Sequence, residues 1–237
     1  MKQFTSQFQL KFGNQSNKFQ YGRVTSGARS RDYDSALSWL LSSTMIHKCS
    51  LLNKVEIPPL AFIVPNHFKL YLSDVGILLN LLEVNLSDIM LGKLKLYNGV
   101  IAENYVATQL IANGNTLIYW ESGNTAEVDF IFYNEHGIIP IEVKANDHVN
   151  SKSLNVYVSR YHPKYSLRIS TKNFGFENGI KSVPLYATFL IKWLLLKSFK
   201  FQFHFTTTPY YNFASLFVFS TYICFWGPCF WGPYPKT

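Results

Sequence analysis

Hydrophobic residues recur at helical spacing in some segments of the chain and form short apolar or alternating runs in others. In residues 33–43, Leu37, Leu40 and Leu41 fall on one face of a helix, and Asp32 stands where an N-cap is expected. The same reasoning predicts helices at 97–112, 151–161 and 185–197, with a short apolar helix that opens at 73–76 and ends at 82. Strands are predicted at 46–52, 68–72, 116–121, 126–133, 138–144, 166–170 and 180–184.

These elements divide the chain into four parts. Residues 1–30 are a polar, glycine-punctuated lead-in. Residues 31–84 follow the order helix, strand, turn, strand, which is typical of the back half of a winged-helix module and also of an ordinary α/β packing unit. Residues 85–198 alternate helices with strands and are expected to form the main α/β domain. Residues 199–237 differ in composition from everything before them.

The C-terminal tail has no charged residue between 206 and 235, and it repeats Cys-Phe-Trp-Gly-Pro in tandem at 224–228 and 229–233. A perfect short repeat beside a change in composition indicates added sequence outside the fold. A membrane anchor at 211–226 is the competing interpretation, although a spanning helix needs ~20 apolar residues. A membrane partner is therefore not expected, except through this tail.

Composition and charge narrow the class of protein. The chain has 237 residues, of which 48% are hydrophobic and 15% charged, so most of it is expected to fold. Its net charge of +8 favours a polyanionic partner such as nucleic acid, although the excess is spread along the chain. Three cysteines without metal-ligand spacing, and a polar start at 4–12 unlike a signal peptide, predict a cytoplasmic protein.

The predicted hairpin at 126–144 brings acidic residues together. If 134–137 is a four-residue turn, Tyr133 lies opposite Ile138, and counting back places Asp129 opposite Glu142 on one face of the sheet. The same count places Glu127 opposite Lys144. The other face is expected to close a core with the following apolar residues: Val128, Phe130, Phe132, Ile139, Ile141 and Val143.

Two carboxylates side by side repel each other unless a cation lies between them. Asp129 and Glu142 are therefore expected to hold a divalent metal beside Lys144, or else to face water while Glu127 pairs with Lys144. Glu103 lies within the apolar stripe of the helix at 97–112. It is a third candidate ligand if it meets a cation or donors there, and otherwise it extends to the edge of the helix.

The order of Glu103, Asp129 and Glu142-Val143-Lys144 resembles the PD-(D/E)xK, restriction-endonuclease-like superfamily. Four phrases, at 68–76, 127–130, 139–144 and 183–187, more closely resemble the uncharacterised C-terminal domain carried by many prokaryotic AAA-type ATPases. The resemblance covers residues 15–192, although Val128 replaces the proline of the superfamily name. It implies a central mixed sheet flanked by helices, preceded by the partial winged-helix-like segment.

The resemblance also implies a metal-dependent nuclease in which Asp129, Glu142 and Lys144 are catalytic. Asp129 and Glu142, with Glu103 as a further ligand, would hold Mg²⁺ or Mn²⁺. Lys152 and Arg160 are candidate contacts to the phosphates of nucleic acid. The alternative is a docking or regulatory module of an ATPase that keeps the fold without cleavage. In both cases an ATPase domain is the partner in full-length relatives, and this chain is expected to be the C-terminal portion of such a protein.

The sequence contains no G-x-x-x-x-G-K-[ST] phosphate loop. We therefore expect the purified chain to hydrolyse ATP no faster than buffer, as measured by release of inorganic phosphate. Turnover above that background, in a preparation freed of contaminating ATPases, would contradict the prediction.

Overall fold

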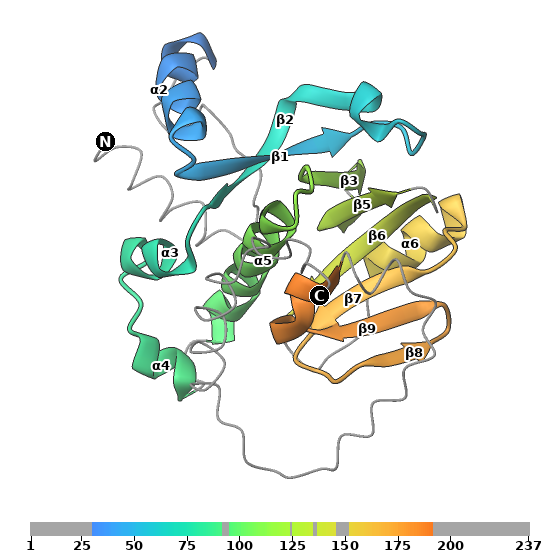
Figure 1. Ribbon diagram of the computed structural model, residues 1–237. Helices are drawn as coiled ribbons and strands as arrows, with labels where there is room; N and C mark the ends of the chain where they lie inside the picture. Colours follow the sequence, from blue (N-terminus) through green and yellow to red (C-terminus); the bar gives the residue numbers. More distant parts are fainter. Residues whose placement is uncertain (1–29, 92–94, 124, 135–136, 146–151, 192–237) are drawn as a thin grey trace, which may run out of the picture. The chain divides into compact units, whose positions relative to one another are not determined.

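The structure is a computed structural model that describes residues 30–91, 95–123, 125–134, 137–145 and 152–191 (Figure 1). The chain divides into two compact units, residues 1–197 and residues 198–237, and the second unit lies wholly outside the described residues. The predictions for the lead-in at 1–29 and for the aromatic tail therefore concern residues that the structure does not describe. Among the helices that it does describe, none has the length and apolarity needed to cross a membrane.

The first sheet contains four strands in the order β2-β1-β3-β4. Its members are β1 (Ile46–Leu52), β2 (Ile63–Leu72), β3 (Ile118–Ser122) and β4 (Ala126–Val128). β1 pairs antiparallel with β2 and parallel with β3, and β3 pairs antiparallel with β4. The hairpin of the predicted winged-helix-like segment is thus part of the same sheet as a strand of the predicted main domain. The boundary at residue 84 stays a prediction.

The second sheet is mixed and contains five strands in the order β5-β6-β7-β9-β8. They are β5 (Phe130–Asn134), β6 (Gly137–Lys144), β7 (Ser166–Ser170), β8 (Gly175–Glu177) and β9 (Ile180–Pro184). β5 and β6 form an antiparallel hairpin, whereas β6, β7 and β9 run parallel. Tyr133 lies opposite Ile138 and Phe130 opposite Ile141, which confirms the register predicted from the four-residue turn.

Two helices cover opposite faces of these sheets (Figure 1). α5 (Lys95–Ala112) lies over the core formed by Phe130, Phe132 and Ile139, to which it contributes Val106 and Leu110. α6 (Lys152–Tyr161) packs on the other face, where Tyr157 contacts a separate core around Trp120. Mixed α/β architecture with flanking helices is therefore confirmed, although the strands form two mixed sheets where one central sheet was predicted.

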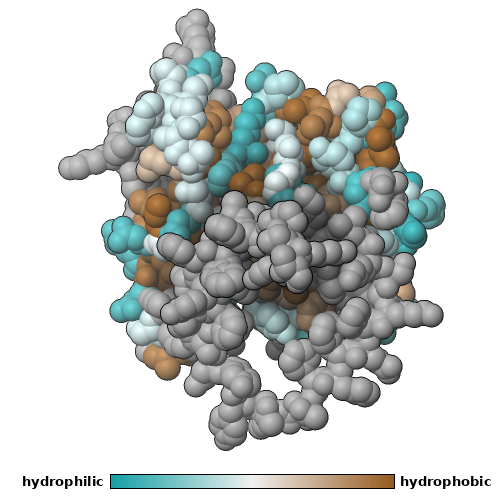
Figure 2. Space-filling view, in the orientation of Figure 1, coloured by the Kyte–Doolittle hydropathy of each residue, from teal (hydrophilic) through white to brown (hydrophobic). Residues whose placement is uncertain are grey.

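Other helices pack against the β1–β2 hairpin or follow it in the chain. α2 (Ser30–Ser42) and α3 (Val75–Leu81) bury Leu37 and Leu78 against the face of β2 that carries Phe68, Leu70 and Leu72. Asp74 caps α3 by accepting a hydrogen bond from the backbone N–H of Ile77. α4 (Leu86–Met90) follows, and the surface near α3 and α4 exposes hydrophobic side chains, among them Ile77 and Leu91 (Figure 2).

The strand predicted at 126–133 is two strands, because the chain changes sheet at Asp129. β4 ends at Val128 and pairs with β3, while β5 begins at Phe130 and pairs with β6. The expectation that Val128 and Phe130 share one core is wrong, since Val128 packs with Trp120 and Phe130 packs beneath α5. In an unbroken strand the side chains of Val128 and Phe130 would point to the same face. The bend at Asp129 turns them to different cores.

Four further elements differ from the predictions or extend them. The predicted helix at 185–197 begins as a short 3-10 helix, η3 (Leu185–Leu190), and residues 192–197 lie outside the described part of the chain. The 3-10 turn η2 (Pro59–Phe62), helix α4 and strand β8 were not predicted. All three are short, so they carry little periodicity.

Asn104 joins α5 to the end of β2 through two hydrogen bonds. Its side chain is fully buried, and its amide accepts a hydrogen bond from Leu72 N (2.9 Å) and donates one to Leu72 O (3.0 Å). Both groups of the Leu72 backbone are therefore satisfied by one side chain from a helix 32 residues away in the sequence.

Asn104→Ala removes both hydrogen bonds and leaves polar backbone groups buried. We expect the free energy of unfolding to fall by about 2–4 kcal/mol, which thermal or urea denaturation will measure. Asn80→Ala, at an exposed position of α3, is the control and is expected to change stability by less than about 0.5 kcal/mol. Equal effects of the two substitutions would contradict the role given to Asn104.

Candidate functional site

Asp129 occupies the bend where the chain passes from one sheet to the other. Its Oδ2 accepts a hydrogen bond from Val143 N at 2.7 Å, which joins the bend to β6. Burial raises the pKa of Asp129 well above its usual range, and the carboxylates of Glu142 and Glu103 raise it further. Lys69 and the Val143 N–H act in the opposite direction but do not outweigh these effects. Asp129 is thus a carboxyl group whose ionised form needs a cation.

Glu142 and Lys144 lie two residues apart on β6 and therefore on the same face of the sheet. Lys144 Nζ is 2.6 Å from Glu142 Oε1, and the side chain of Lys144 is 33% exposed whereas that of Glu142 is 4% exposed. Glu142 Oε2 is buried and finds no hydrogen-bond partner among the described residues. The pair leaves one carboxylate oxygen of Glu142 with unused capacity to accept a proton or a metal ion.

Lys144 carries a positive charge at neutral pH. Burial by itself would lower its pKa, but the charges of Glu142, Asp129 and Glu103 outweigh that effect and raise the pKa. The side chain therefore donates hydrogen bonds and supplies charge, and it does not serve as a base.

A second group, the Lys69 cluster, consists of Lys69, Tyr71, Glu103 and Glu127. Lys69 is fully buried on β2, and its Nζ lies 3.1 Å from Glu103 Oε1 and 2.6 Å from Glu127 Oε1. The hydroxyl of Tyr71 also donates to Glu103 Oε1. Burial alone would lower the pKa of Lys69, but the carboxylates of Glu103, Glu127 and Asp129 hold it well above its ordinary value.

This cluster resolves two alternatives that the sequence left open. Glu103 is buried and meets both a cation and a phenol, so it does not extend to the edge of α5. The expected pair of Glu127 with Lys144 is wrong, because Glu127 pairs with Lys69 and Lys144 pairs with Glu142. The bend at Asp129 is the reason, since β4 pairs with β3 and Glu127 lies opposite Glu121 instead of Lys144.

Lys69 and Tyr71 were missed as site residues. The signal for them was the alternation Phe68-Lys69-Leu70-Tyr71-Leu72, which places two polar side chains on the face opposite an apolar one. That face points at α5, where Cys49 and Tyr119 complete the surroundings and the Tyr119 ring lies 5.1 Å from Lys69 Nζ. A lysine on a covered face needs carboxylate partners, and the acids of the site supply them.

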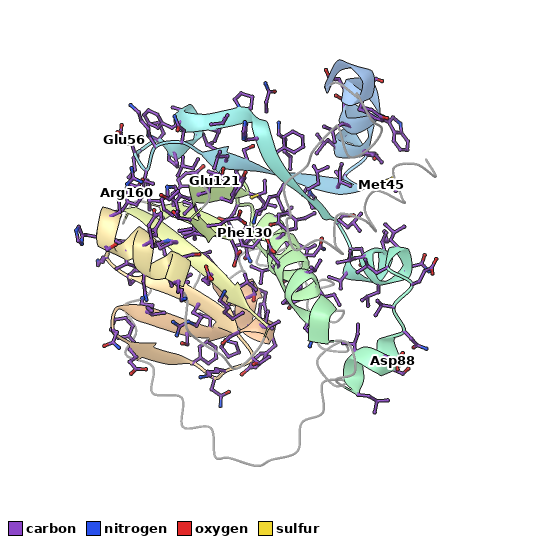
Figure 3. The ribbon with its side chains drawn as sticks, turned by 180° about the vertical axis from the view of Figure 1, so that it is seen from behind. Met45, Glu56, Asp88, Glu121, Phe130 and Arg160 are labelled. Carbon is purple, nitrogen blue, oxygen red and sulfur yellow. The ribbon has the colours of Figure 1, made fainter. Side chains whose placement is uncertain are left out.

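The two predicted phosphate contacts lie on α6. Lys152 is its first residue and Arg160 belongs to its last turn, and both side chains are exposed. Figure 3 shows Arg160 on the outer side of α6, whereas Phe130 lies beside α5. Their role as phosphate contacts stays a prediction.

Carboxylates outnumber ammonium groups around Asp129. Four carboxylates (Glu103, Glu127, Asp129 and Glu142) interact with two lysines, Lys69 and Lys144. Within the described residues, no group of three or more His, Cys, Asp or Glu side chains stands in a geometry that would hold a metal ion as it is. Asp129 and the unused oxygen of Glu142 nevertheless fit Mg²⁺, which binds through one or two carboxylates and keeps several waters.

Comparisons with known protein families match two segments of the chain. Residues 98–188 match the family model described as a domain of unknown function (DUF4143), and residues 1–88 match a second one, a domain of unknown function (DUF8612). No curated protein and no solved structure matches the chain significantly. Asp129, Glu142 and Lys144 thus belong to a segment similar to DUF4143, whereas Lys69 and Tyr71 belong to a segment similar to DUF8612.

Proposed function

We propose that the chain carries a Mg²⁺-dependent phosphodiesterase site of the restriction-endonuclease-like type, acting on nucleic acid, with Asp129, Glu142 and Lys144 as its catalytic residues. The observation that carries the proposal is the buried, unpartnered Oε2 of Glu142 beside Asp129. A buried carboxylate oxygen without a partner is costly, and a metal ion offsets that cost.

The fold gives independent support. A mixed sheet with α5 and α6 on opposite faces is the arrangement that the resemblance to this superfamily implies. The acidic residues converge where the chain passes from β4 to β5 and where β6 ends. Functional side chains commonly gather at such interruptions in the pairing of strands.

Each residue has a distinct part in the proposed reaction. Asp129 and Glu142 would hold Mg²⁺, with Glu103 as a further ligand, direct or through water. Mg²⁺ in such a site polarises the phosphodiester and lowers the pKa of a bound water. Lys144, protonated and 33% exposed, would donate to the water or to the phosphoryl oxygens on which negative charge accumulates.

The partners follow from charge and from the resemblance. A net charge of +8 favours a polyanion, and Lys152 and Arg160 are proposed to contact its phosphates. An ATPase domain is the proposed partner in longer relatives, and the proposed location is the cytoplasm.

A docking or regulatory module without cleavage is the second candidate, and one observation favours it. Lys69 supplies an internal cation to Glu103 and Glu127, so part of the acidic cluster is neutralised by the protein itself. In a purely structural site, the raised pKa of Asp129 would favour its neutral form, and no metal would be needed. Metal binding therefore separates the two candidates.

Addition of Mn²⁺ or Mg²⁺ is expected to stabilise the full chain. At a metal concentration a hundredfold above Kd the gain is ~2.7 kcal/mol, or roughly 5–10 °C in Tm for a unit of this size. Asp129→Asn and Glu142→Gln should abolish the shift, which differential scanning fluorimetry will measure. The matched control, Glu56→Gln, changes an exposed acid outside the site and should keep it. If millimolar Mn²⁺ leaves the Tm of the wild-type chain unchanged, the docking module is favoured instead.

Lys144→Ala is expected to separate metal binding from cleavage. The metal-dependent shift in Tm should persist, because Asp129 and Glu142 remain, whereas cleavage of plasmid and single-stranded DNA in Mn²⁺ should fall to background. Cleavage by Lys144→Ala at the wild-type rate would remove Lys144 from the proposed mechanism.

Without metal, Asp129→Asn is expected to raise stability, and by more as the pH rises. The pKa of Asp129 is about 3.9 in an unfolded chain and well above that in the folded state. Between these values the folded state binds more protons, so the free energy of unfolding falls as the pH rises. Asparagine has no such titration and can still accept from Val143 N. Denaturation in EDTA should give similar stabilities near pH 4 and a more stable variant at neutral pH.

A further inference from the structure

Arg168 on β7 is the immediate neighbour of Glu142. The two residues are paired in register in the parallel β6–β7 ladder, as are Lys144 and Ser170. Leu167 and Ile169 point into the core beneath α5, so Arg168 lies on the opposite face, together with Glu142 and Lys144. α6 covers this face mainly at β4 and β6.

Glu142 and Arg168 carry opposite charges but do not pair with each other. Glu142 Oε2 and Arg168 Nε are both buried, and neither has a hydrogen-bond partner in the part of the chain that the structure describes. Burial lowers the pKa of Arg168, and Glu142 and Glu177 raise it less. Unpaired charged atoms of opposite sign on adjacent strands are costly, and a direct ion pair would have removed the cost.

An anionic ligand bound by Arg168, with a cation between it and Glu142, explains why the two side chains do not pair. We infer that Arg168 is a phosphate-binding residue, and that one phosphodiester of a nucleic-acid strand lies between its guanidinium group and the carboxylate site. This inference rests on the proposed function and adds the residue that binds the anion. A guanidinium group matches two oxygens of a phosphate with parallel N–H donors, and arginine is half-buried here, which strengthens such bonds.

The placement has a chemical consequence for the same phosphodiester. Glu142 would hold the divalent cation on one side of the phosphate, and Arg168 would donate on the other, with Lys144 two residues along β6. Negative charge that develops on the phosphoryl oxygens would then face cationic groups that the sheet fixes in advance. Arg168 therefore supplements Lys152 and Arg160, the proposed phosphate contacts on α6.

The test measures binding in the absence of cleavage. A fluorescein-labelled single-stranded oligonucleotide is titrated with the full chain in Ca²⁺, which carboxylates bind as they bind Mg²⁺, and anisotropy gives Kd over a range of salt concentrations. Gel electrophoresis checks that the oligonucleotide stays intact. Arg168→Gln is expected to weaken binding about tenfold and to reduce the slope of log K against log salt by about 0.7. Arg168→Lys, which keeps the charge but loses the parallel donors, should restore the salt slope and only part of the affinity.

Lys181→Gln is the matched control. Lys181 lies on the adjacent strand β9 and stacks 3.8 Å from the centre of the Tyr165 ring, on the face beneath α5. Its substitution also removes one positive charge, but from the face of the sheet opposite Arg168. It should therefore leave Kd and the salt slope unchanged. Arg168→Gln should also keep the wild-type Tm, because no described residue bonds to Arg168 Nε.

Three results would overturn the inference. They are an unchanged Kd for Arg168→Gln, an equal loss for Lys181→Gln, and no binding of the oligonucleotide by the wild-type chain. The proposed nuclease activity fails in a different way, through the absence of a metal-dependent shift in Tm and of cleavage. A further outcome is binding that depends on Arg168 in a chain that shows neither a metal-dependent shift in Tm nor cleavage. That result would support the phosphate site, and the protein would then be a docking module that binds nucleic acid.

Discussion

The ammonium group of Lys69 is the charge on which the arrangement of this protein depends. A fully buried lysine is tolerated when carboxylates surround it, and here Glu103 from α5 and Glu127 from β4 do so. These contacts fix the helix and the strand relative to β2, and Tyr71 adds a hydrogen bond to the same carboxylate. Removal of the lysine would take the cation from the buried carboxylate of Glu103 and leave it only its other hydrogen bonds, which is more costly than the loss of one surface ion pair.

The position of Asp129 follows from the contacts that fix β4 against β2. β4 is held to β3 and to Lys69, β5 is held to β6, and the single residue between them has to bridge the two sheets. Its carboxylate is oriented by the backbone N–H of Val143, a group that does not change with protonation. A side chain fixed by backbone geometry, close to Glu142 and Glu103, suits a function that requires precise placement of negative charge.

Much of the fold was open to prediction, because turn length and alternation determine local pairing. The register from Phe130 to Asn134 followed from four turn residues, and the helices at α5 and α6 followed from their apolar stripes. The bend at Asp129 was not predictable, because apolar residues continue through it and conceal the change of sheet. The partners of Lys69 were not predictable either, since Glu103 lies 34 residues away and no local rule connects them. The sequence therefore identified the carboxylates Glu103, Asp129 and Glu142 as site residues. It did not identify Lys69, the cation with which Glu103 pairs.

The parallel pairing of β1 with β3 also constrains how the chain acquires its structure during synthesis. β1 leaves the ribosome long before Ile118–Ser122 exists, so the β1–β2 hairpin waits with one edge unpaired while helices α3 to α5 are made. Pairings between segments distant in sequence form slowly, and open edges of hairpins promote association between chains. The nascent chain is therefore prone to aggregate until β3 emerges. Codon choice or chaperone binding before that point would change the yield of folded protein but not the folded structure.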